Sequence, residues 1–280
     1  MTGARGDGED VCRSDAARHG TVTVVPRGEP AVSVVIPVKD DAALLTRCLS
    51  ALVAQDRPVD EIIVVDNGSS DDSADRARAA GARVVRCDDP GIPAAASAGY
   101  DAARGDLILR LDADCVPEPG WVRAVVGAFA ADADIAAFTG RARFTDGPAA
   151  LRTPLELLYL GAYRALLGLT LGHPPLFGSN LAFRREAWES VRGEVHRDDP
   201  ELHDDLDLAF HLGRGHRIGM LPEGRMGMSM RPFTDGRFGR RVHRGYRSVV
   251  VHWPHDFPPR RWRRLVTESL RRRAARRVLA

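Results

Sequence analysis

Between Val32 and Val116 the chain alternates short, continuously apolar runs with segments that have the spacing or composition of helices. Residues 43–53 place their apolar side chains on one helical face, and residues 94–103 resemble an Ala-rich helix broken by Gly99. The apolar runs are VSVVIPV (32–38), EIIVVD (61–66), ARVVRC (82–87) and LILRL (107–111). Such runs are typical of strands buried on both faces. The alternation predicts an α/β fold with a Rossmann-like, mostly parallel central sheet flanked by helices.

After about residue 135 this alternation becomes less regular. The segment IAAFTGRARF (135–144) predicts a strand pair, or a single strand kinked at Gly140. We expect helices at 184–191 and from about Asp204 to Leu212, and a strand at 217–221.

One strongly apolar segment, LELLYLGAYRALLGLTLG (155–172), has to be considered as a membrane span. A spanning helix needs about 20 nearly uncharged residues. This segment contains Glu156 and Arg164, so a buried or interfacial helix is the better prediction.

Composition adds few constraints. A formal net charge of +2 gives no reason to expect nucleic acid as a partner. The cysteines Cys12, Cys48, Cys87 and Cys115 lack paired or metal-type spacing, which favours reduced thiols in a cytosolic protein. Residues 1–28 are polar and glycine-rich, without the apolar stretch of a secretory signal, and predict a disordered tail.

The apolar runs end in acidic turns. Ligands collect at the carboxyl edge of open α/β sheets, where the loops diverge. Asp112 and Asp114 follow the run LILRL, and residues i and i+2 of an extended segment point to the same side. Their carboxylates therefore suit one hard divalent cation, Mg²⁺ or Mn²⁺, which shares its coordination with substrate phosphates. Other Asp-x-Asp triplets, at Asp132/Asp134 and Asp205/Asp207, do not end an apolar strand.

Two further acidic residues follow the earlier strands. Asp66 ends EIIVVD and could bind a base or ribose, or cap the next helix. Asp40 follows Pro37 and Lys39, where simple turn chemistry is the alternative to ligand binding.

The order of these motifs resembles the family-2 glycosyltransferases of the GT-A fold. The resemblance rests on SVVIPVKDD (33–41), VVDNGSSDDS (64–73) and LRLDAD (109–114). It continues through FGSNLAFRREAWESV (177–191) and DDLDLAFHLGRGHRI (204–218), so that it covers residues 32–230.

The resemblance implies a role for each matching position. Pro37, Val38, Asp40 and Asp66 would line the nucleotide pocket, Asp112 would face the ribose or sugar, and Asp114 would hold the metal with it. Asp205 would be the general base, and the acceptor-side residues would be Gly178, Ser179, Asn180 and Asp204. On this division, residues 29–135 form the nucleotide-sugar-binding half, 136–230 the acceptor-binding and catalytic half, and 231–280 a basic C-terminal segment.

The chain departs from the family pattern at two places. Ala95, Ala96 and Ser97 stand where the family commonly has Ala-Arg-Asn, so a nucleotide- or sugar-side contact is lost or comes from elsewhere. The Gln-x-x-Arg-Trp motif of processive members is missing, although Arg261 and Trp262 form an Arg-Trp pair. We therefore expect a non-processive enzyme that transfers one sugar and then releases its product.

Basic residues near the C-terminus are further candidates. His243, His252 and His255 could each supply a third metal contact. Arg237, Arg240, Arg241 and Arg244 could close over the diphosphate or form a solvated surface. Residues 260–280 resemble a basic amphipathic helix, which could be solvated or lie on an anionic membrane and so suit a lipid-linked acceptor. The predicted location is cytoplasmic, with or without peripheral contact at the inner face of the membrane.

The function that the resemblance implies is metal-dependent, inverting transfer of one sugar from a nucleotide-diphosphate sugar to the hydroxyl of a lipid-linked or small-molecule acceptor. A sugar-1-phosphate nucleotidyltransferase is an alternative, but it would be expected to have a Gly-rich basic loop where this chain has IPVKDD (36–41). The other alternative is a non-catalytic nucleotide-sugar-binding homologue.

Overall fold

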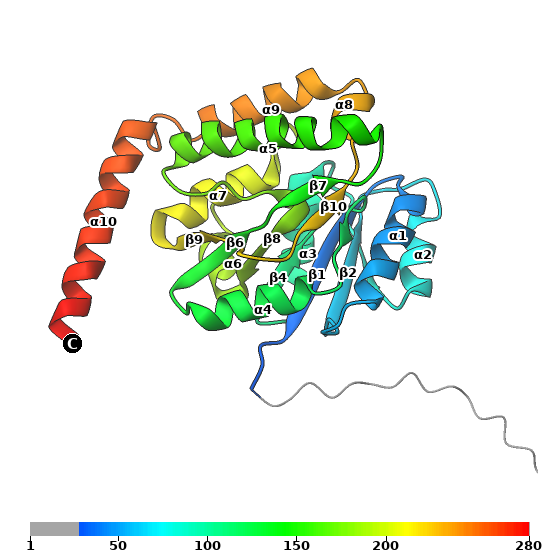
Figure 1. Cartoon of the computed structure of the whole chain (residues 1–280), viewed down its shortest axis with the longest axis horizontal. Helices are drawn as coiled ribbons and strands as arrows, with labels where there is room; N and C mark the ends of the chain where they lie inside the picture. Colours follow the sequence, from blue (N-terminus) through cyan, green and yellow to red (C-terminus); the bar gives the residue numbers. More distant parts are fainter. Residues whose placement is uncertain (1–27, 280) are drawn as a thin grey trace, which may run out of the picture.

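The computed structural model describes residues 28–279, with the side chains of residues 268, 269 and 271–279 outside the description. The predicted disordered tail, residues 1–28, therefore falls outside the described residues except for its last position, and so does Cys12. Figure 1 shows a central sheet with helices on both faces, and the last helix extends away from it.

The main sheet of the described chain has seven strands in the order β3-β2-β1-β4-β8-β6-β9. Their bounds are β1 Val32–Val38, β2 Glu61–Asp66, β3 Arg83–Arg86, β4 Leu107–Arg110, β6 Ile135–Thr139, β8 Leu181–Arg184 and β9 Arg217–Met220. Strands β3, β2, β1 and β4 pair in parallel, as do β6 and β9, whereas β8 runs antiparallel to both of its neighbours. The predicted mostly parallel sheet is confirmed, and it extends across both predicted halves of the chain.

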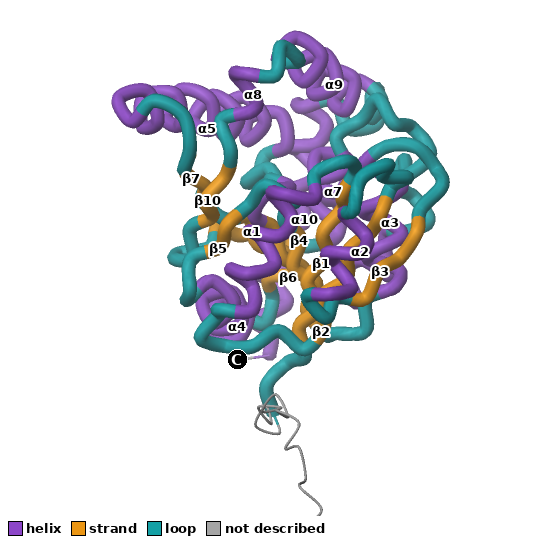
Figure 2. Tube along the Cα trace, turned by 90° about the vertical axis from the view of Figure 1, so that its right-hand side faces the viewer, coloured by secondary structure: helices purple, strands orange, loops and turns teal. Residues whose placement is uncertain are grey.

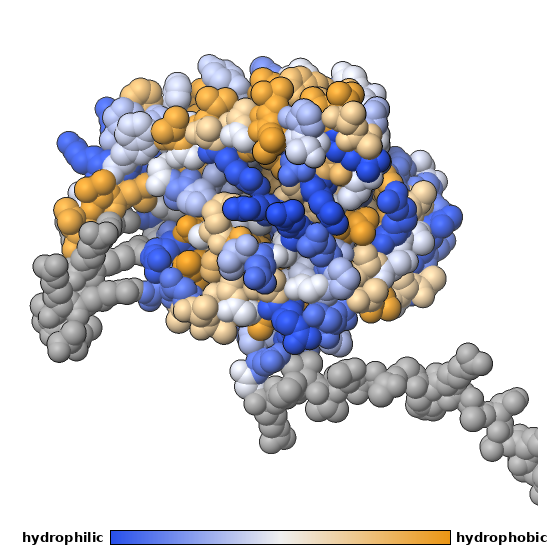
Figure 3. Space-filling model, viewed as in Figure 1, coloured by the Kyte–Doolittle hydropathy of each residue, from blue (hydrophilic) through white to orange (hydrophobic). Residues whose placement is uncertain are grey.

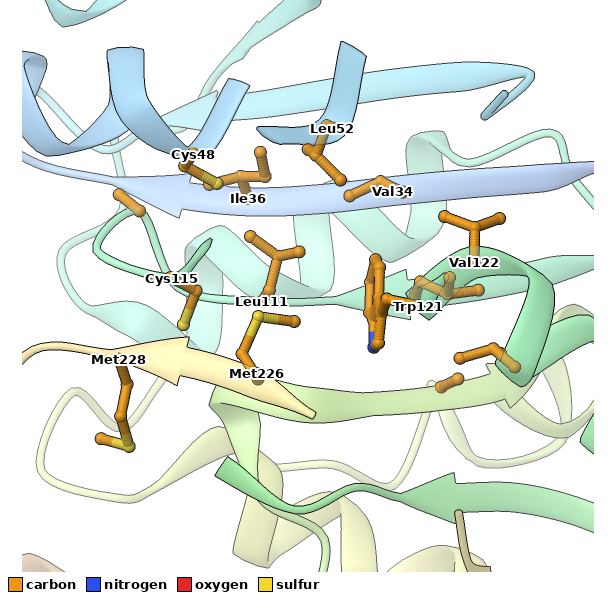
Figure 4. Close-up of a cluster of buried hydrophobic side chains, with 14 of the residues drawn as sticks. Val34, Ile36, Cys48, Leu52, Leu111, Cys115, Trp121, Val122, Met226 and Met228 are labelled. Atoms are coloured by element: carbon orange, nitrogen blue, oxygen red, sulfur yellow. The ribbon is translucent and has the colours of Figure 1, made fainter. Parts of the chain in front are cut away.

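Helices cover the two faces of this sheet. They are α1 Ala42–Val53, α2 Ser73–Ala79, α3 Ile92–Ala102, α4 Trp121–Ala131, α6 Arg185–Val191 and α7 Asp204–Gly215. Alternate residues of β1 point to opposite faces, so that Val34 and Ile36 pack with α1 and α4, and Val35 packs with α3, α6 and α7. Figure 4 shows the first of these cores, in which Trp121 lies beside Leu111 and Met226.

Gly99 does not break its helix, contrary to the sequence prediction, because α3 continues to Ala102. A Cβ at this position would lie 2.3 Å from Val35 Cγ1 and 2.8 Å from Val65 Cγ2. The glycine therefore lets α3 approach β1 and β2 more closely than any side chain would allow.

A second, three-stranded sheet lies beside the first in the described chain, in the order β5-β10-β7 (Figure 2). It consists of β5 Val116–Pro117, β10 Met226–Met228 and β7 Ala142–Phe144. The segment 135–144 is thus two strands in two sheets, divided at Gly140, and not a pair. Helix α5 (Ala149–Leu171), the 3₁₀ turn η1 (Gly178–Asn180), α8 (Arg231–Thr234) and α9 (Phe238–Val250) complete this side.

Helix α5 is mostly exposed, so the prediction of a buried helix is wrong. Leu157, Leu158, Leu166 and Leu169 are each at least 65% exposed, and only Leu160 and Leu171 are buried. None of the helices in the described part of the chain combines the length and the apolar character that a bilayer span requires. The interfacial alternative stays a prediction.

The last helix, α10 (Pro258–Leu279), is anchored at its first turn by the Arg-Trp pair. Arg261 is 1% exposed and donates to the carbonyls of Leu171 and Phe210, and Trp262 donates to the carbonyl of Leu169. The pair therefore has a structural role here, joining α10 to α5 and α7.

Candidate active site

A cleft of about 370 Å³ opens where β1 and β4 end. The lining residues from the first part of the chain include Pro37, Val38, Lys39, Asp41, Asn67, Arg110, Asp112 and Asp114. Those from later in the chain include Tyr159, Gly178, Ser179, His203, Asp204, Asp205, Arg231, Arg237 and Arg241. Eight of the eleven predicted site residues line this one cleft, although they come from positions 37 to 205 of the sequence. Another cavity of about 400 Å³, near Glu118 and Gly224, contains none of them.

The carboxylates of Asp112 and Asp114 lie together at the end of β4. An oxygen of each, with the Cys115 sulfur, falls within a span of 4.8 Å. Burial raises the pKa of Asp114, as does the charge of Asp112, while Arg231 opposes the rise. Burial also keeps the Cys115 thiol protonated by raising its pKa well above the usual value, which leaves two hard oxygen donors.

Two side chains from later in the chain, Ser179 and Arg231, hold these two carboxylates in place. The Ser179 hydroxyl donates to Asp112 Oδ2 at 2.7 Å. Arg231 Nη2 lies 3.0 Å from Asp114 Oδ2, and its Nη1 lies 2.6 Å from Asp41 Oδ2. Sequence reasoning missed Arg231, since its two partners are 117 and 190 positions away and no spacing marks it.

Arg110 is a buried cation at the floor of the cleft. Its side chain is 3% exposed and lies 3.0 Å from Asp112 and 3.4 Å from Asp204. Burial alone would lower its pKa, but the surrounding carboxylates raise the pKa well above the ordinary value. Sequence reasoning missed this residue as well, although an arginine inside the apolar run LILRL was a signal.

The predicted acceptor-side residue Gly178 packs directly against Arg110. A Cβ at position 178 would lie 1.8 Å from Arg110 Nη1, so only glycine leaves room for the guanidinium. The Gly178 N–H in turn donates to Asp205 Oδ2 at 2.6 Å. This glycine therefore connects the buried arginine to the helix that carries the predicted base.

Asp204 and Asp205 begin α7, where the helix dipole favours negative charge. Both oxygens of Asp205 accept backbone N–H groups, from Gly178 at 2.6 Å and Leu206 at 2.7 Å. Asp204 Oδ2 is buried with no hydrogen-bond partner among the described residues. Burial raises the pKa of Asp204 to about 6; Arg110 opposes the rise, and Asp205 adds to it.

Three predicted site residues do not line the cleft. Asp40 accepts the Ser70 N–H at 2.6 Å, which lowers the pKa of Asp40, and Asp66 accepts the Ser69 N–H at 2.9 Å. Asn180 is fully buried, where it accepts from Trp121 and donates to the carbonyls of Arg141 and Gly224. All three satisfy groups of the chain itself, and the turn alternative describes the observed contacts of Asp40. Asp66 does not cap the next helix, because its contact is with Ser69 and α2 begins at Ser73.

None of the histidines proposed as a third metal contact lines the cleft. His243 and His255 are exposed, and His252 is buried against Asp207. His203 is the histidine in the cleft lining. The geometry therefore does not support any of these three histidines as a metal ligand in the cleft. The sequence could not reveal this, because it does not show in which direction the end of α9 faces.

Two of the four arginines predicted to close over the diphosphate line the cleft. These are Arg237 and Arg241, and Arg241 is paired with Asp235 at 2.6 Å. Arg240 and Arg244 instead face Glu201, at 2.5 and 3.9 Å.

Comparison with known proteins finds relatives that match about a third of the chain. The chain is 37% identical over 106 residues to glucosyl-3-phosphoglycerate synthase of Mycolicibacterium paratuberculosis, a match that covers 34% of this chain and 32% of that protein. It is 40% identical over 98 residues to undecaprenyl-phosphate 4-deoxy-4-formamido-L-arabinose transferase of Pseudomonas paraeruginosa, covering 31% and 29%. These matches span about a third of the length of the curated relatives.

The fold is similar to that of the mannosyltransferase PcManGT from Pyrobaculum calidifontis, solved with GDP-Man and Mn²⁺. The TM-score is 0.63 at 22% identity, over 89% of this chain and 71% of that one. This likeness confirms the predicted GT-A fold. The family model described as Glycosyl transferase family 2 matches residues 33–192, more than half of the sequence. The chain therefore belongs to glycosyl transferase family 2.

Proposed function

We propose that this protein is a metal-dependent, inverting glycosyltransferase that moves one sugar from a nucleotide-diphosphate sugar to an acceptor hydroxyl. One observation carries the proposal: two acidic pairs, Asp112/Asp114 and Asp204/Asp205, line a single cleft at the carboxyl ends of the strands. An inverting displacement needs a neutralised leaving group on one side of the sugar and a base on the other.

The donor side fits a divalent cation. Asp112 and Asp114 offer two hard oxygens, the donors that Mg²⁺ and Mn²⁺ prefer beside substrate phosphates. When bound, the cation would supply charge neutralisation to the diphosphate. Arg231, Arg237 and Arg241 lie on the same cleft and would bind the phosphate oxygens that remain. The Mn²⁺ and GDP-Man of the similar mannosyltransferase structure support this assignment.

On the acceptor side, Asp205 is our candidate for the general base. Two backbone N–H groups hold its carboxylate in one orientation, and each oxygen keeps a lone pair for the acceptor proton. Asp204 is the competing candidate because its pKa is raised to about 6, near the value that suits a base at neutral pH. In either case the carboxylate takes the hydroxyl proton while the acceptor oxygen bonds to the anomeric carbon and the nucleoside diphosphate leaves.

The acceptor is proposed to carry a phosphate. The two curated relatives reported above are named for phosphate compounds, one a small molecule and one a lipid phosphate. A lipid-linked acceptor is favoured by exposed apolar side chains on neighbouring helices: Leu157, Leu158, Leu166 and Leu169 of α5, and Phe238, Val242 and Tyr246 of α9. Figure 3 shows apolar residues gathered along this edge of the molecule. We call this set the α5–α9 surface and propose it as a peripheral membrane contact.

The predicted contact through residues 260–280 remains part of this proposal. Trp262, Val266 and Leu270 are exposed on α10, at 43%, 60% and 60%. Trp262 nevertheless donates its indole N–H to the Leu169 carbonyl of α5, so part of this face of α10 packs against the rest of the protein.

The function can be tested by supplying UDP-, GDP- and TDP-sugars with and without Mn²⁺ and following release of nucleoside diphosphate. We expect one donor class to be turned over, only with metal, and the rate to rise with a phosphate-bearing acceptor. NMR of the product would report the anomeric configuration and test inversion. Binding without turnover in every combination would favour the non-catalytic homologue. Pyrophosphate release from a nucleoside triphosphate and a sugar 1-phosphate would favour the nucleotidyltransferase.

A further inference from the structure

A second group of metal-type side chains lies outside the cleft. Asp207 and His211 are one turn apart on α7, His252 directly follows α9, and His196 belongs to the loop between α6 and α7. The side chains of Asp207, His211 and His252 are 5%, 4% and 1% exposed, and that of His196 is 37% exposed. We call these four residues the Asp207 cluster.

Three imidazole rings converge on a single carboxylate oxygen. Asp207 Oδ1 lies 2.7 Å from His196 Nδ1, 3.1 Å from His252 Nε2 and 3.6 Å from His211 Nε2. The Nε2 atoms of His211 and His252 are 3.4 Å apart. The second carboxylate oxygen of Asp207 is fixed separately, by the backbone N–H of His196 at 2.8 Å.

The hydrogen bond on the far side of His252 determines which nitrogen faces Asp207. Its Nδ1 lies 2.8 Å from the Ser248 carbonyl, which can only accept, so Nδ1 carries the proton. The other ring nitrogen, Nε2, then faces Asp207 and His211. Phe210 stacks on the ring at a centroid distance of 4.1 Å and holds this orientation. At 3.1 Å from the carboxylate, Nε2 either donates a proton to Asp207 or directs its lone pair at a cation between them.

The spacing fits a tetrahedral metal site. Bonds of about 2.0–2.1 Å to a four-coordinate Zn²⁺ place neighbouring donor atoms about 3.3 Å apart. Four of the six separations among the donor atoms are 2.7 to 3.6 Å, and all six are within 4.8 Å. Metal-bound histidines also usually donate their other ring N–H to a carbonyl or carboxylate, as His252 does to Ser248.

We propose that the Asp207 cluster binds one Zn²⁺-type transition metal ion through three imidazoles and one carboxylate. Imidazole donors select such an ion over the Mg²⁺ or Mn²⁺ proposed for the cleft. With four protein ligands the site is closed, which is the arrangement of a structural zinc site. It would join three parts of the fold: α7, the end of α9, and the loop that contains His196.

The Asp207 cluster adjoins the cleft through α7. Asp204 lies one helical turn before Asp207, so an ion here would also steady the start of α7 at the cleft.

The proposal is tested by measuring the zinc content of the purified full-length chain after dialysis. We expect about one zinc per chain in the wild type and in Asp114→Asn, and less than about 0.1 in His252→Gln and Asp207→Asn. His243→Gln removes an exposed histidine and serves as the matched control, which should retain zinc. Added Zn²⁺ should raise the Tm of the wild type and not that of His252→Gln, since a ligand stabilises only the form that binds it.

Because the cluster variants could fail to fold, the wild type provides an independent readout. Co²⁺ added to the metal-free wild-type chain should give the intense visible bands of tetrahedral cobalt, and Zn²⁺ should abolish them. Zinc content in His252→Gln equal to that of the wild type would overturn the proposal. So would a wild-type chain that shows neither a Tm shift with Zn²⁺ nor a tetrahedral cobalt spectrum; hydrogen bonds alone would then hold the cluster.

Discussion

The guanidinium of Arg231 lies 3.0 Å from the carboxylate of Asp114, the residue proposed to hold the metal. The same guanidinium reaches Asp41, 2.6 Å away on the loop after β1. The first residue of α8 thus supplies a cation to the carboxylates that follow β1 and β4. A metal ion bound at Asp114 would share this carboxylate with Arg231, so the arginine and the metal compete in part and together neutralise the diphosphate.

Replacing Arg231 should separate these two effects. In Arg231→Ala the competing cation is gone, so Mn²⁺ should bind several-fold more tightly in the absence of donor, as measured by calorimetry. With donor present, kcat/KM should fall by about tenfold or more, since a charge-assisted contact to phosphate contributes roughly 1.5–3 kcal/mol. Arg143→Ala, which removes a half-exposed surface ion pair with Glu118, is the control and should change neither value. Weaker Mn²⁺ binding in Arg231→Ala would contradict this account.

Paired amide variants distinguish the two candidate bases. Asp205→Asn should lower kcat by roughly 10²–10⁴-fold with little change in donor affinity, because a positioned base contributes that much to the chemical step. Asp204→Asn should lower kcat much less. The assignment is wrong if the larger loss occurs in Asp204→Asn, and single-turnover kinetics would show that the chemical step is the one affected.

Asp204 should make the folded state less stable as pH rises. Its pKa is about 6 in the fold, against 3.8 in an unperturbed chain, so the folded state binds the proton more tightly. Asp204 therefore lowers the free energy of unfolding progressively between about pH 4 and 6, and the full loss is reached above that range. Asp204→Asn should be more stable than wild type at pH 7.5, by on the order of 1–3 kcal/mol, and equal to it near pH 4.

Thermal unfolding across this pH range is the measurement. The control is Asp88→Asn, which changes a side chain that is 76% exposed. Its Tm should equal that of the wild type at every pH. A lower Tm of Asp204→Asn at pH 7.5 would mean that the ion pair with Arg110 outweighs the burial of the carboxylate.

Gly178→Ala should damage both stability and activity. The new methyl group would meet the Arg110 guanidinium at 1.8 Å and push it from Asp112. Overpacking of this kind costs typically about 1–3 kcal/mol. Gly193→Ala is the matched control, because a Cβ there meets nothing within 4 Å. Equal Tm values for the two variants would show that Arg110 can move aside freely.

The α5–α9 surface should bind anionic vesicles. Liposome flotation with phosphatidylglycerol should recover the wild type, and Leu166→Ser/Tyr246→Ser should lower the recovery several-fold, because these exposed apolar side chains would enter the interface. A chain ending at residue 259 tests the separate contribution of α10. Equal recovery of all three forms would remove membrane contact from the proposal.

The first half of the fold could be predicted because its apolar runs are continuous and its turns acidic. Asp112 and Asp114 could be predicted for the same reason, because they follow an apolar strand. Asp204 and Asp205 were predicted only from the resemblance of residues 204–218 to the family. Gly99 was misread because a glycine within a helix can mark a break or a close approach, and only packing against Val35 distinguishes them. Arg231 and the orientation of His252 depend on contacts between segments more than 40 residues apart, for which the sequence has no local signal.

Arg110 gives the cleft a property that neither pair of carboxylates has alone. It lies between Asp112 and Asp204, so the donor and acceptor sides share one buried positive charge. A cation that binds at Asp112 favours the ionised form of Asp204, and loss of the Asp204 proton must strengthen cation binding by the same factor. Loading of the donor side with a cation and the charge of Asp204 would thus be thermodynamically linked, so that cation affinity should rise with pH across the titration of Asp204.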